Sequence, residues 1–369
     1  MKDRIIISIW ADPTNYINLL FLINYLIKKK QKITLICKFI EHKEDFFYFI
    51  KKSKNLKVIE LNQNGKIGFF YFLITKIVSF FKTRPKTVIS INFISLFFSR
   101  FLYNKNINWI YYNFDFDISK KLLLNNYIEK KIIKKVDCIF LPSKSRVKFY
   151  KKIFFRKNKI FPIYNCFSKS FKIQNYKLKK IDKKLKYKNY LVRLGSFYKH
   201  HYLKELALKT KFWKHDKYLV MAGKSYAGYF EEMIEFKKKN NLSKLILLKD
   251  ISYKKWFILL NNAVAGFALY KAINVSHNLM GGTSQKLNNY IFAGIPSFIN
   301  NNNDFIKFNN KFETSIIVQN SLGDLNRKIN YLLQDKNYYR KKIKKNRSAF
   351  IGEFNFEKQI ERVKNYILI

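Results

Sequence analysis

The chain has 369 residues, 48% of them apolar and 18% aromatic, and its formal net charge is +49. This length predicts two domains, and the apolar content excludes a disordered protein. Lys, Asn, Ile, Phe and Tyr are all in excess, as an AT-rich genome imposes, and the basic residues are spread along the chain. The positive charge therefore does not by itself indicate a nucleic-acid-binding protein. It does favour attraction to anionic membranes and phosphate-bearing substrates.

The first half alternates short apolar segments with longer amphipathic ones, which is typical of parallel strands covered by helices on both faces. A helix is expected over 14–30, with Asp12 as its cap and Pro13 in its first turn. The alternation predicts a doubly wound α/β domain over 1–168. Its expected strands are 5–11, 32–38, 56–61, 87–92, 107–113 and 138–142.

A Lys-rich segment without clear periodicity follows, and we take 169–189 as a linker. The alternation then resumes, including a helix over 253–262 with Ser252 as its cap. Such a pair of domains binds ligands at the carboxyl ends of its strands, but the pattern alone does not distinguish glycosyltransferases, epimerases, dehydrogenases and periplasmic-type binding proteins. The expected strands are 190–195, 217–222, 245–248, 264–270, 297–300 and 315–319, and the closing helices are 322–333, 337–347 and 356–367.

The cysteines show no metal or disulfide spacing. Cys37, Cys138 and Cys166 are far apart, so we expect buried thiols in a reducing compartment, and we expect no metal site. The first apolar stretch is too short for a signal peptide, and the longest apolar run, 68–81, is too short to span a bilayer. The expected location is cytoplasmic, with a peripheral position on the inner face of the membrane as a further option.

The segment 263–296 carries the strongest local signal. A buried strand leads through a polar loop to a helix that Thr283 or Ser284 caps and Gly294 ends. The N–H groups at such a helix start bind diphosphate, and Lys286 in the first turn adds positive charge, while Asn289 is placed to reach a ribose hydroxyl. The alternative is a capped helix that only links two strands.

The same segment resembles a known family. It reads Ser284-Gln-Lys-Leu-Asn-Asn-Tyr-Ile-Phe-Ala-Gly-Ile-Pro296 and resembles the donor-site motif of retaining GT-B glycosyltransferases of family 4, Ser/Pro-x-Lys-Leu-x-Glu-Tyr-x-x-x-Gly-x-Pro. The segments 191–197 and 218–223 resemble the opening strands of the family's nucleotide-binding domain, and Asn165 resembles the Asn that closes its N-terminal domain. The resemblance covers 137–369 and is only topological before that.

The resemblance implies an α/β GT-B fold, in which two Rossmann-like doubly wound domains face each other across a cleft. Residues 1–168 would bind the acceptor, 190–352 the sugar nucleotide, and 353–369 would form a helix that crosses back to the first domain. The implied reaction transfers a sugar, with retention, from a nucleoside-diphosphate sugar to a glycan or lipid-linked acceptor. Surface polysaccharide or lipopolysaccharide biosynthesis is the expected setting, with no metal or cofactor.

The resemblance also implies a donor site, with Lys286 as a catalytic residue that stabilises the departing diphosphate. Two departures stand out: Asn289 occupies the place of a common glutamate, and Gly281 that of another. Ser196 takes the place of the usual Arg, and Lys199 or His201 that of the usual Lys. The diphosphate would then be held by the helix N–H groups, Lys286, and Lys199 or Arg193. The donor residues are Gly195, Ser196, Lys199, Gly223, Thr283, Ser284, Lys286, Leu287 and Asn289.

Asn113, Asp115 and Asp117 follow a strand of the first domain. We expect Asn113 and Asp117 to bind acceptor hydroxyls and Asp115 to act in catalysis by polarising the nucleophile; a solvated turn is the alternative for each. The basic–aromatic stretches 67–82 and 144–157 are either helices at an anionic membrane surface or ordinary core-facing helices.

Three rival functions are weighed against sugar transfer. A sugar-nucleotide 2-epimerase has the same architecture but needs a set of acid–base groups that the sequence does not display. A nucleic-acid-binding protein needs a concentrated basic face with exposed aromatic residues. A dehydrogenase is disfavoured because no Gly-x-Gly-x-x-Gly follows the first strand.

Overall fold

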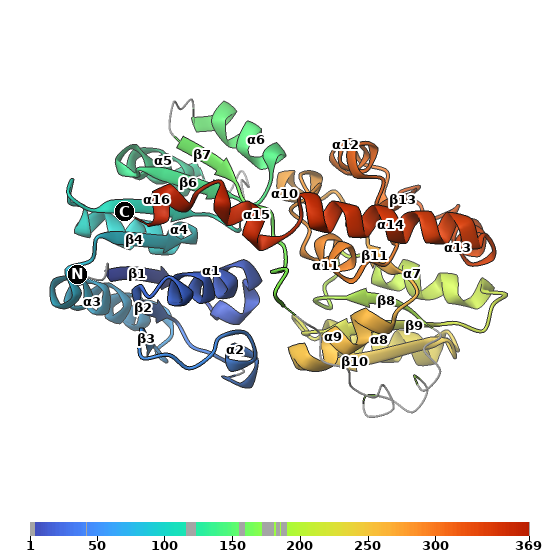
Figure 1. Ribbon diagram of the computed structural model, residues 1–369. Helices are drawn as coiled ribbons and strands as arrows, with labels where there is room; N and C mark the ends of the chain where they lie inside the picture. The colour runs from blue at the N-terminus through green and yellow to red at the C-terminus, as the bar shows by residue number, and fades with distance from the viewer. Residues whose placement is uncertain are drawn as a thin grey trace. The chain divides into compact units, whose positions relative to one another are not determined.

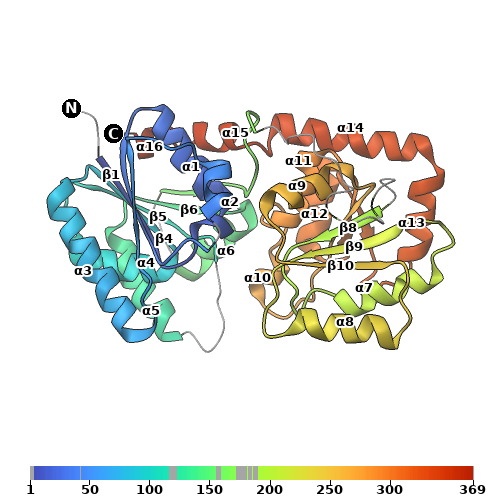
Figure 2. The same cartoon turned by 90° about the horizontal axis from the view of Figure 1, so that it is seen from below.

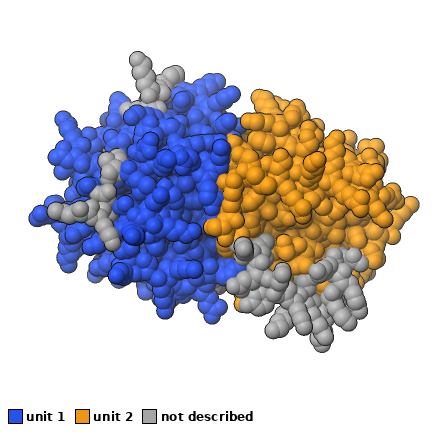
Figure 3. Space-filling model, viewed as in Figure 1, with its two compact units in different colours: residues 1–168, 356–369 blue, residues 169–355 orange. Residues whose placement is uncertain are grey.

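The computed structural model describes residues 4–41, 43–115, 123–154, 159–171, 181, 185 and 190–368. The chain divides into two compact units: unit 1 consists of residues 1–168 and 356–369, and unit 2 of residues 169–355 (Figure 3). Most of the expected linker, 169–189, lies outside the described residues. Phe171, at its start, packs against Phe257 and Phe292 of unit 2, with ring centroids 5.0 and 6.0 Å away.

Unit 1 contains a seven-stranded parallel sheet in the order β3-β2-β1-β4-β5-β6-β7 (Figure 1). The strand order reverses between β1 and β4, which is the doubly wound arrangement predicted from the sequence. The strand β7 was not predicted, because four residues that end in a proline carry little strand signal. The strands are β1 (Arg4–Ile9), β2 (Lys32–Cys37), β3 (Leu56–Glu60), β4 (Thr87–Ile91), β5 (Asn108–Tyr112), β6 (Cys138–Leu141) and β7 (Lys159–Pro162).

Helices cover both faces of this sheet (Figures 1 and 2). On one face, Phe72, Leu96 and Tyr150 belong to a single apolar cluster. On the other, the ring of Phe21 lies 6.0 Å from Phe49 and 5.8 Å from Phe356. The helices are α1 (Ile17–Lys28), α2 (Lys43–Phe49), α3 (Gly65–Thr83), α4 (Asn92–Ser99), α5 (Leu123–Ile132), α6 (Lys144–Phe154), α15 (Phe356–Glu361) and α16 (Lys364–Ile367), with 3-10 turns at Arg100–Leu102 and Ile133–Lys135.

The ends of the first and last helices differ from the sequence expectation. Asp12 does act as a cap, since its Oδ1 accepts from the backbone N–H of Thr14 at 2.8 Å. It caps a 3-10 turn, Pro13–Asn15, and α1 begins only after that turn. The expected closing helix over 356–367 is divided into α15 and α16, and Asn108 Nδ2 donates to the carbonyl of Tyr366 at 2.5 Å. The tail therefore packs against the sheet of unit 1.

Unit 2 contains a six-stranded parallel sheet in the order β10-β9-β8-β11-β12-β13. Its strands are β8 (Tyr190–Leu194), β9 (Tyr218–Gly223), β10 (Leu245–Lys249), β11 (Gly266–Ala268), β12 (Ser297–Asn300) and β13 (Ser315–Val318). The strand β11 is shorter than the expected 264–270. Beyond Ala268 the chain leaves the ladder, because the backbone N–H of Tyr270 donates to the side chain of Asn300 at 2.6 Å.

The helices of unit 2 also match the expectation only in part. The expected helix over 253–262 is present as α9, and Ser252 stands at its N-cap position as expected, but the Ser252 side chain makes no capping hydrogen bond. The helices are α7 (Leu203–Lys209), α8 (Tyr229–Lys239), α9 (Tyr253–Asn262), α10 (Val275–Asn278), α11 (Gln285–Ala293), α12 (Asn303–Phe312), α13 (Leu325–Gln334) and α14 (Lys336–Gly352), with a 3-10 turn at Thr210–Phe212.

The three cysteines are free and buried, as expected: Cys37, Cys138 and Cys166. Across the described residues, we find no helix with both the length and the apolar content needed to cross a bilayer.

Candidate functional site

The helix α11 begins with a defined cap. Ser284 Oγ accepts from the backbone N–H of Leu287 at 3.2 Å, so Ser284, and not Thr283, caps the helix. The hydroxyl of Tyr270 lies 2.7 Å from Ser284 Oγ and fixes it from the end of β11. The structure gives no hydrogen-bond partner to the backbone N–H groups of Gln285 and Lys286, as expected for the first turn of a helix. These two groups are available to an anion.

The side chain of Lys286 extends from this first turn to Gly195, which itself lies against Gly223. Its Nζ lies 3.2 Å from the hydroxyl of Tyr270, and a Cβ added to Gly195 would lie 2.8 Å from its Cε. A Cβ on Gly223 would in turn lie 2.1 Å from the carbonyl oxygen of Gly195. Both glycines stand at the carboxyl ends of neighbouring strands, β8 and β9. The structure therefore brings Gly195, Gly223, Ser284 and Lys286 together, and the glycines are needed for this close approach.

Arg193 completes a buried basic cluster. It is only 2% exposed, and its Nη1 donates to the carbonyls of Gly195 at 2.5 Å and Ser196 at 2.7 Å. Its Nη2 lies 2.8 Å from Nδ1 of His201, which must accept because a guanidinium only donates. Ser196 thus contributes a backbone carbonyl to the site.

The charges of this cluster are not balanced by the protein. Burial lowers the pKa of Arg193 to about 10, and burial together with Arg193 holds the pKa of Lys286 well below its usual value. Burial, and then Lys286 and Arg193, lower the pKa of His201, which keeps that ring neutral. Among the described residues, no carboxylate is close enough to affect the pKa of Arg193 or Lys286. Buried cations are normally paired, so the arrangement favours an anionic ligand.

Asn289, one turn after Lys286 in α11, carries a donor without a partner. It is 1% exposed, and its Oδ1 accepts from Gln285 Nε2 at 2.7 Å, whereas its Nδ2 has no partner in the structure. Two other predicted donor residues do not join the cluster. Leu287 is fully buried and offers no side chain to a ligand, and Lys199 is exposed and takes no part in these hydrogen bonds.

Gly281, which stands where the family that the sequence resembles often has a glutamate, contacts a carboxylate from another element. Its backbone N–H donates to Oδ2 of Asp304, in the first turn of α12, at 2.6 Å. A Cβ at position 281 would lie 2.6 Å from the backbone oxygen and 2.9 Å from the Oδ2 of Asp304. Asp304 therefore occupies the space of a side chain at 281 and anchors the turn that precedes α11.

Sequence reasoning left Tyr270 and Asp304 out of the donor set and considered Arg193 only as an alternative to Lys199 for the diphosphate. One signal was present for Arg193, since it is the single charged residue in an otherwise apolar strand, β8. Tyr270 looked like the end of a strand. Asp304 lies 23 positions from Gly281 and gave no sign of the contact.

Two of the expected acceptor-side residues, Asn113 and Asp115, follow the carboxyl end of β5 in unit 1. Asp115 is exposed, and its Oδ2 accepts from the hydroxyl of Tyr16 and, at 2.7 Å, from Nδ2 of Asn92. Asn92 adopts a left-handed backbone, with φ of 59°, and its Oδ1 accepts from the N–H of Phe114 at 2.8 Å. These contacts hold Asp115 at the edge of the sheet where a doubly wound fold binds ligands.

Of the other two expected acceptor residues, the structure describes only Asn113. Asn113 is buried, and its side chain hydrogen-bonds to Glu129, whose pKa burial raises to about 7. Asn113 therefore supports the core behind Asp115 and is not exposed to a ligand. Asp117 lies outside the described residues.

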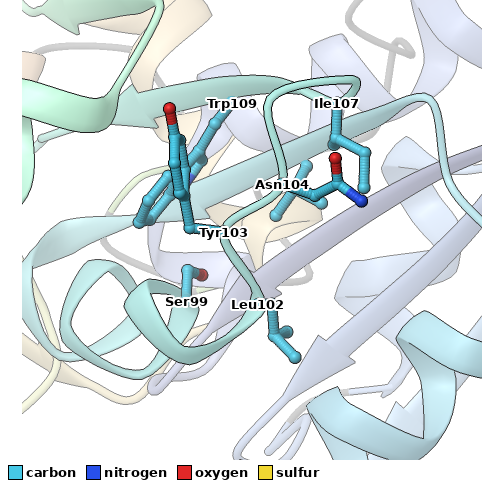
Figure 4. Close-up of a pocket in the computed structure, with 7 residues that line it drawn as sticks. Ser99, Leu102, Tyr103, Asn104, Ile107 and Trp109 are labelled. Carbon is cyan, nitrogen blue, oxygen red and sulfur yellow. The ribbon is translucent and has the colours of Figure 1, made fainter.

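A small pocket occurs elsewhere in unit 1 (Figure 4). It is lined by Val88, Ser99, Leu102, Tyr103, Asn104, Ile107 and Trp109. The loop before β5 forms part of its wall, so it lies at the amino ends of the strands, at the edge opposite Asp115. It does not belong to the candidate site.

No family model and no curated protein matches this sequence. Similar solved structures include Anabaena HepE in complex with UDP-glucose (TM-score 0.76, 9% identity, 99% of each chain covered) and WaaG, a glycosyltransferase involved in lipopolysaccharide biosynthesis (0.70, 9%, 98% of this chain and 99% of that one). A putative UDP-N-acetylglucosamine 2-epimerase from Listeria monocytogenes is also similar (0.66, 11%, 100% and 96%). With the two parallel sheets, the likeness shows a GT-B fold; at such identities it shows the fold alone.

Proposed function

We propose that this GT-B chain is a glycosyltransferase that moves a sugar from a nucleoside-diphosphate sugar to a glycan or lipid-linked acceptor, with retention at the anomeric carbon. The observation that carries the proposal is the buried pair Arg193 and Lys286, at the end of β8 and the start of α11, for which the described part of the chain offers no carboxylate partner. A diphosphate supplies the missing negative charge. WaaG, of similar fold, acts in lipopolysaccharide biosynthesis, and we propose that pathway or surface polysaccharide biosynthesis here.

The proposed chemistry is mainly electrostatic. As the bond between the sugar and the diphosphate breaks, negative charge grows on the departing phosphate. Arg193, Lys286 and the free N–H groups at the start of α11 stabilise that charge, and they are fixed before the reaction begins. Asn289 would donate a hydrogen bond from Nδ2 to a ribose oxygen. The glutamate that the resembled family commonly has at this place would accept a hydrogen bond instead. We propose that no metal ion is required.

In unit 1, Asp115 is the proposed catalytic group on the acceptor side. Its carboxylate is held by Tyr16 and Asn92, and it remains exposed at the carboxyl edge of the sheet. There it would accept the hydrogen bond of an acceptor hydroxyl and orient it for attack.

The first test is a thermal-shift panel with UDP-, GDP-, ADP- and CMP-sugars, with and without EDTA. One nucleotide class should raise the unfolding temperature, EDTA should not change the shift, and Lys286→Ala should remove it. If no nucleotide stabilises the protein, or if Lys286→Ala responds like the wild type, the donor-site assignment is wrong. Chromatography of the binding donor after incubation without acceptor distinguishes the alternative, because a 2-epimerase would convert the sugar while a transferase leaves its configuration unchanged.

A further inference from the structure

The outer face of α3 is unusual for a surface helix. Every exposed residue from Ile67 to Phe81 is large and apolar, and no polar residue interrupts the series. Their spacing places them along one side of the helix, and Figures 1 and 2 show α3 at the outer edge of unit 1. The apolar face consists of Ile67 (66% exposed), Phe70 (61%), Tyr71 (46%), Ile74 (39%), Val78 (43%) and Phe81 (70%).

Two polar side chains in the middle of α3, those of Lys76 and Ser79, point inward instead. Lys76 is fully buried, and its Nζ donates to the carbonyl of Ser95 at 2.8 Å and to the hydroxyl of Ser99 at 2.6 Å. Ser79 is buried as well. A helix against water normally shows the reverse arrangement. Because Lys76 donates these hydrogen bonds to α4, the rotation of α3 about its own axis is fixed. The outward direction of its apolar face is fixed with it.

Further aromatic residues extend this surface. Phe69 of α3 packs against Phe98 of α4, with centroids 6.1 Å apart. The neighbouring Phe97 and the exposed Phe101 both lie under the guanidinium of Arg100, at 4.3 and 4.5 Å. An aromatic residue with a cation above it is well suited to the boundary between lipid headgroups and acyl chains.

The charge around the apolar face has a single sign. Between Glu60 and Asp115 the sequence has no Asp or Glu. The exposed basic residues of this stretch are Lys66 and Lys82, at the two ends of the apolar face, together with Arg84, Lys86, Arg100 and Lys105. Apolar side chains bordered by basic ones are the arrangement that binds anionic bilayers.

We infer that α3 lies flat on an anionic lipid surface, with its apolar face inserted at the level of the headgroups and Lys66 and Lys82 against the phosphates. A second copy of this chain is a poorer occupant, because two surfaces with the same positive charge would be brought together. The second basic–aromatic stretch has no such role: in α6, Val147, Tyr150 and Phe154 are buried, which makes it a core-facing helix. The inference does not depend on the proposed sugar transfer.

The test compares binding to vesicles of phosphatidylcholine alone with binding to an equimolar mixture of phosphatidylcholine and phosphatidylglycerol, by flotation. The double variant Phe70→Ser/Phe81→Ser keeps every charge and removes two of the most exposed rings. The matched control is Phe212→Ser, since Phe212 is also 70% exposed but lies in unit 2. We expect the wild type and Phe212→Ser to bind the mixed vesicles, and the double variant to bind at least about tenfold more weakly.

Two outcomes would overturn the inference. One is equal vesicle binding by the double variant and the wild type, which would leave only attraction by the net charge. The other is a dimer in sedimentation experiments that dissociates in the double variant, which would assign the apolar face to a second copy. The nucleotide-induced thermal shift should be the same in all three proteins, so a failure here is distinguishable from a failure of the donor site.

Discussion

The contact between Lys286 and Gly195 offers a sharp test of how the cluster is built. A methyl group at position 195 would lie 2.8 Å from Cε of Lys286, whereas carbon atoms in contact lie about 3.5–4.0 Å apart. The atom that must move belongs to the end of a flexible side chain, so Gly195→Ala should displace the ammonium group by about 1 Å from the place where the diphosphate would bind. A hydrogen bond from a charged group contributes about 1.5–3 kcal/mol, and losing it predicts a fall in nucleotide affinity of roughly ten- to hundredfold.

Gly195 also has φ of +120°, so alanine adds backbone strain of about 1–3 kcal/mol wherever the methyl group points. Gly228 supplies the control, since its φ is +71° and a Cβ there would meet nothing within 4 Å. Both variants should lose stability in urea titrations, and only Gly195→Ala should lose affinity in calorimetric titrations with the nucleotide. Equal affinities for the two variants would show that Lys286 does not reach the ligand across Gly195.

Three further predictions follow from the same contacts. Asp304→Ala removes the acceptor for the N–H of Gly281 and should cost about 1–3 kcal/mol in urea unfolding, with weaker nucleotide binding; an unchanged affinity would mean that the turn before α11 holds without it. Asn92→Gly keeps the left-handed backbone but removes one of the two hydrogen bonds that hold the carboxylate of Asp115, so sugar transfer should fall while nucleotide affinity stays constant, and a fall in affinity would contradict the assignment to the acceptor side. At alkaline pH, where the phosphates are fully ionised, nucleotide binding should take up a proton, because the diphosphate raises the lowered pKa of Lys286. Affinity should therefore fall as pH rises from the pKa of Lys286 in the free protein to its pKa in the complex. Calorimetry in buffers of different ionisation enthalpy should detect this uptake in the wild type and not in Lys286→Met.

The sequence was sufficient for the strands other than β7 and for the end of α11. Continuous apolar segments such as Cys138–Leu141 predict buried parallel strands directly, and Gly294 adopts the left-handed conformation, with φ of 70°, that its place at the end of a helix indicates. These features depend on neighbouring residues, so a local pattern contains them.

The remainder depends on contacts between distant segments. Nothing near Gly281 in the sequence indicates Asp304, and the shortening of β11 comes from Asn300, a residue of the next strand. Apolar periodicity also fails for α3 and α6, because both carry aromatic and basic residues. Only packing shows that Tyr150 of α6 is buried and that Phe81 of α3 is exposed.

The central claim is that Arg193 and Lys286 bind the diphosphate of a sugar nucleotide. It is tested most directly by calorimetric titration of the nucleoside diphosphate selected by the panel, and of its nucleoside, into the wild type, Lys286→Met and Lys199→Met. The exposed Lys199 serves as the control for a lost surface charge. The wild type and Lys199→Met should bind the diphosphate far more tightly than the nucleoside, and Lys286→Met should reduce that difference roughly ten- to hundredfold. An undiminished difference in Lys286→Met, or an equal loss in Lys199→Met, would contradict the account.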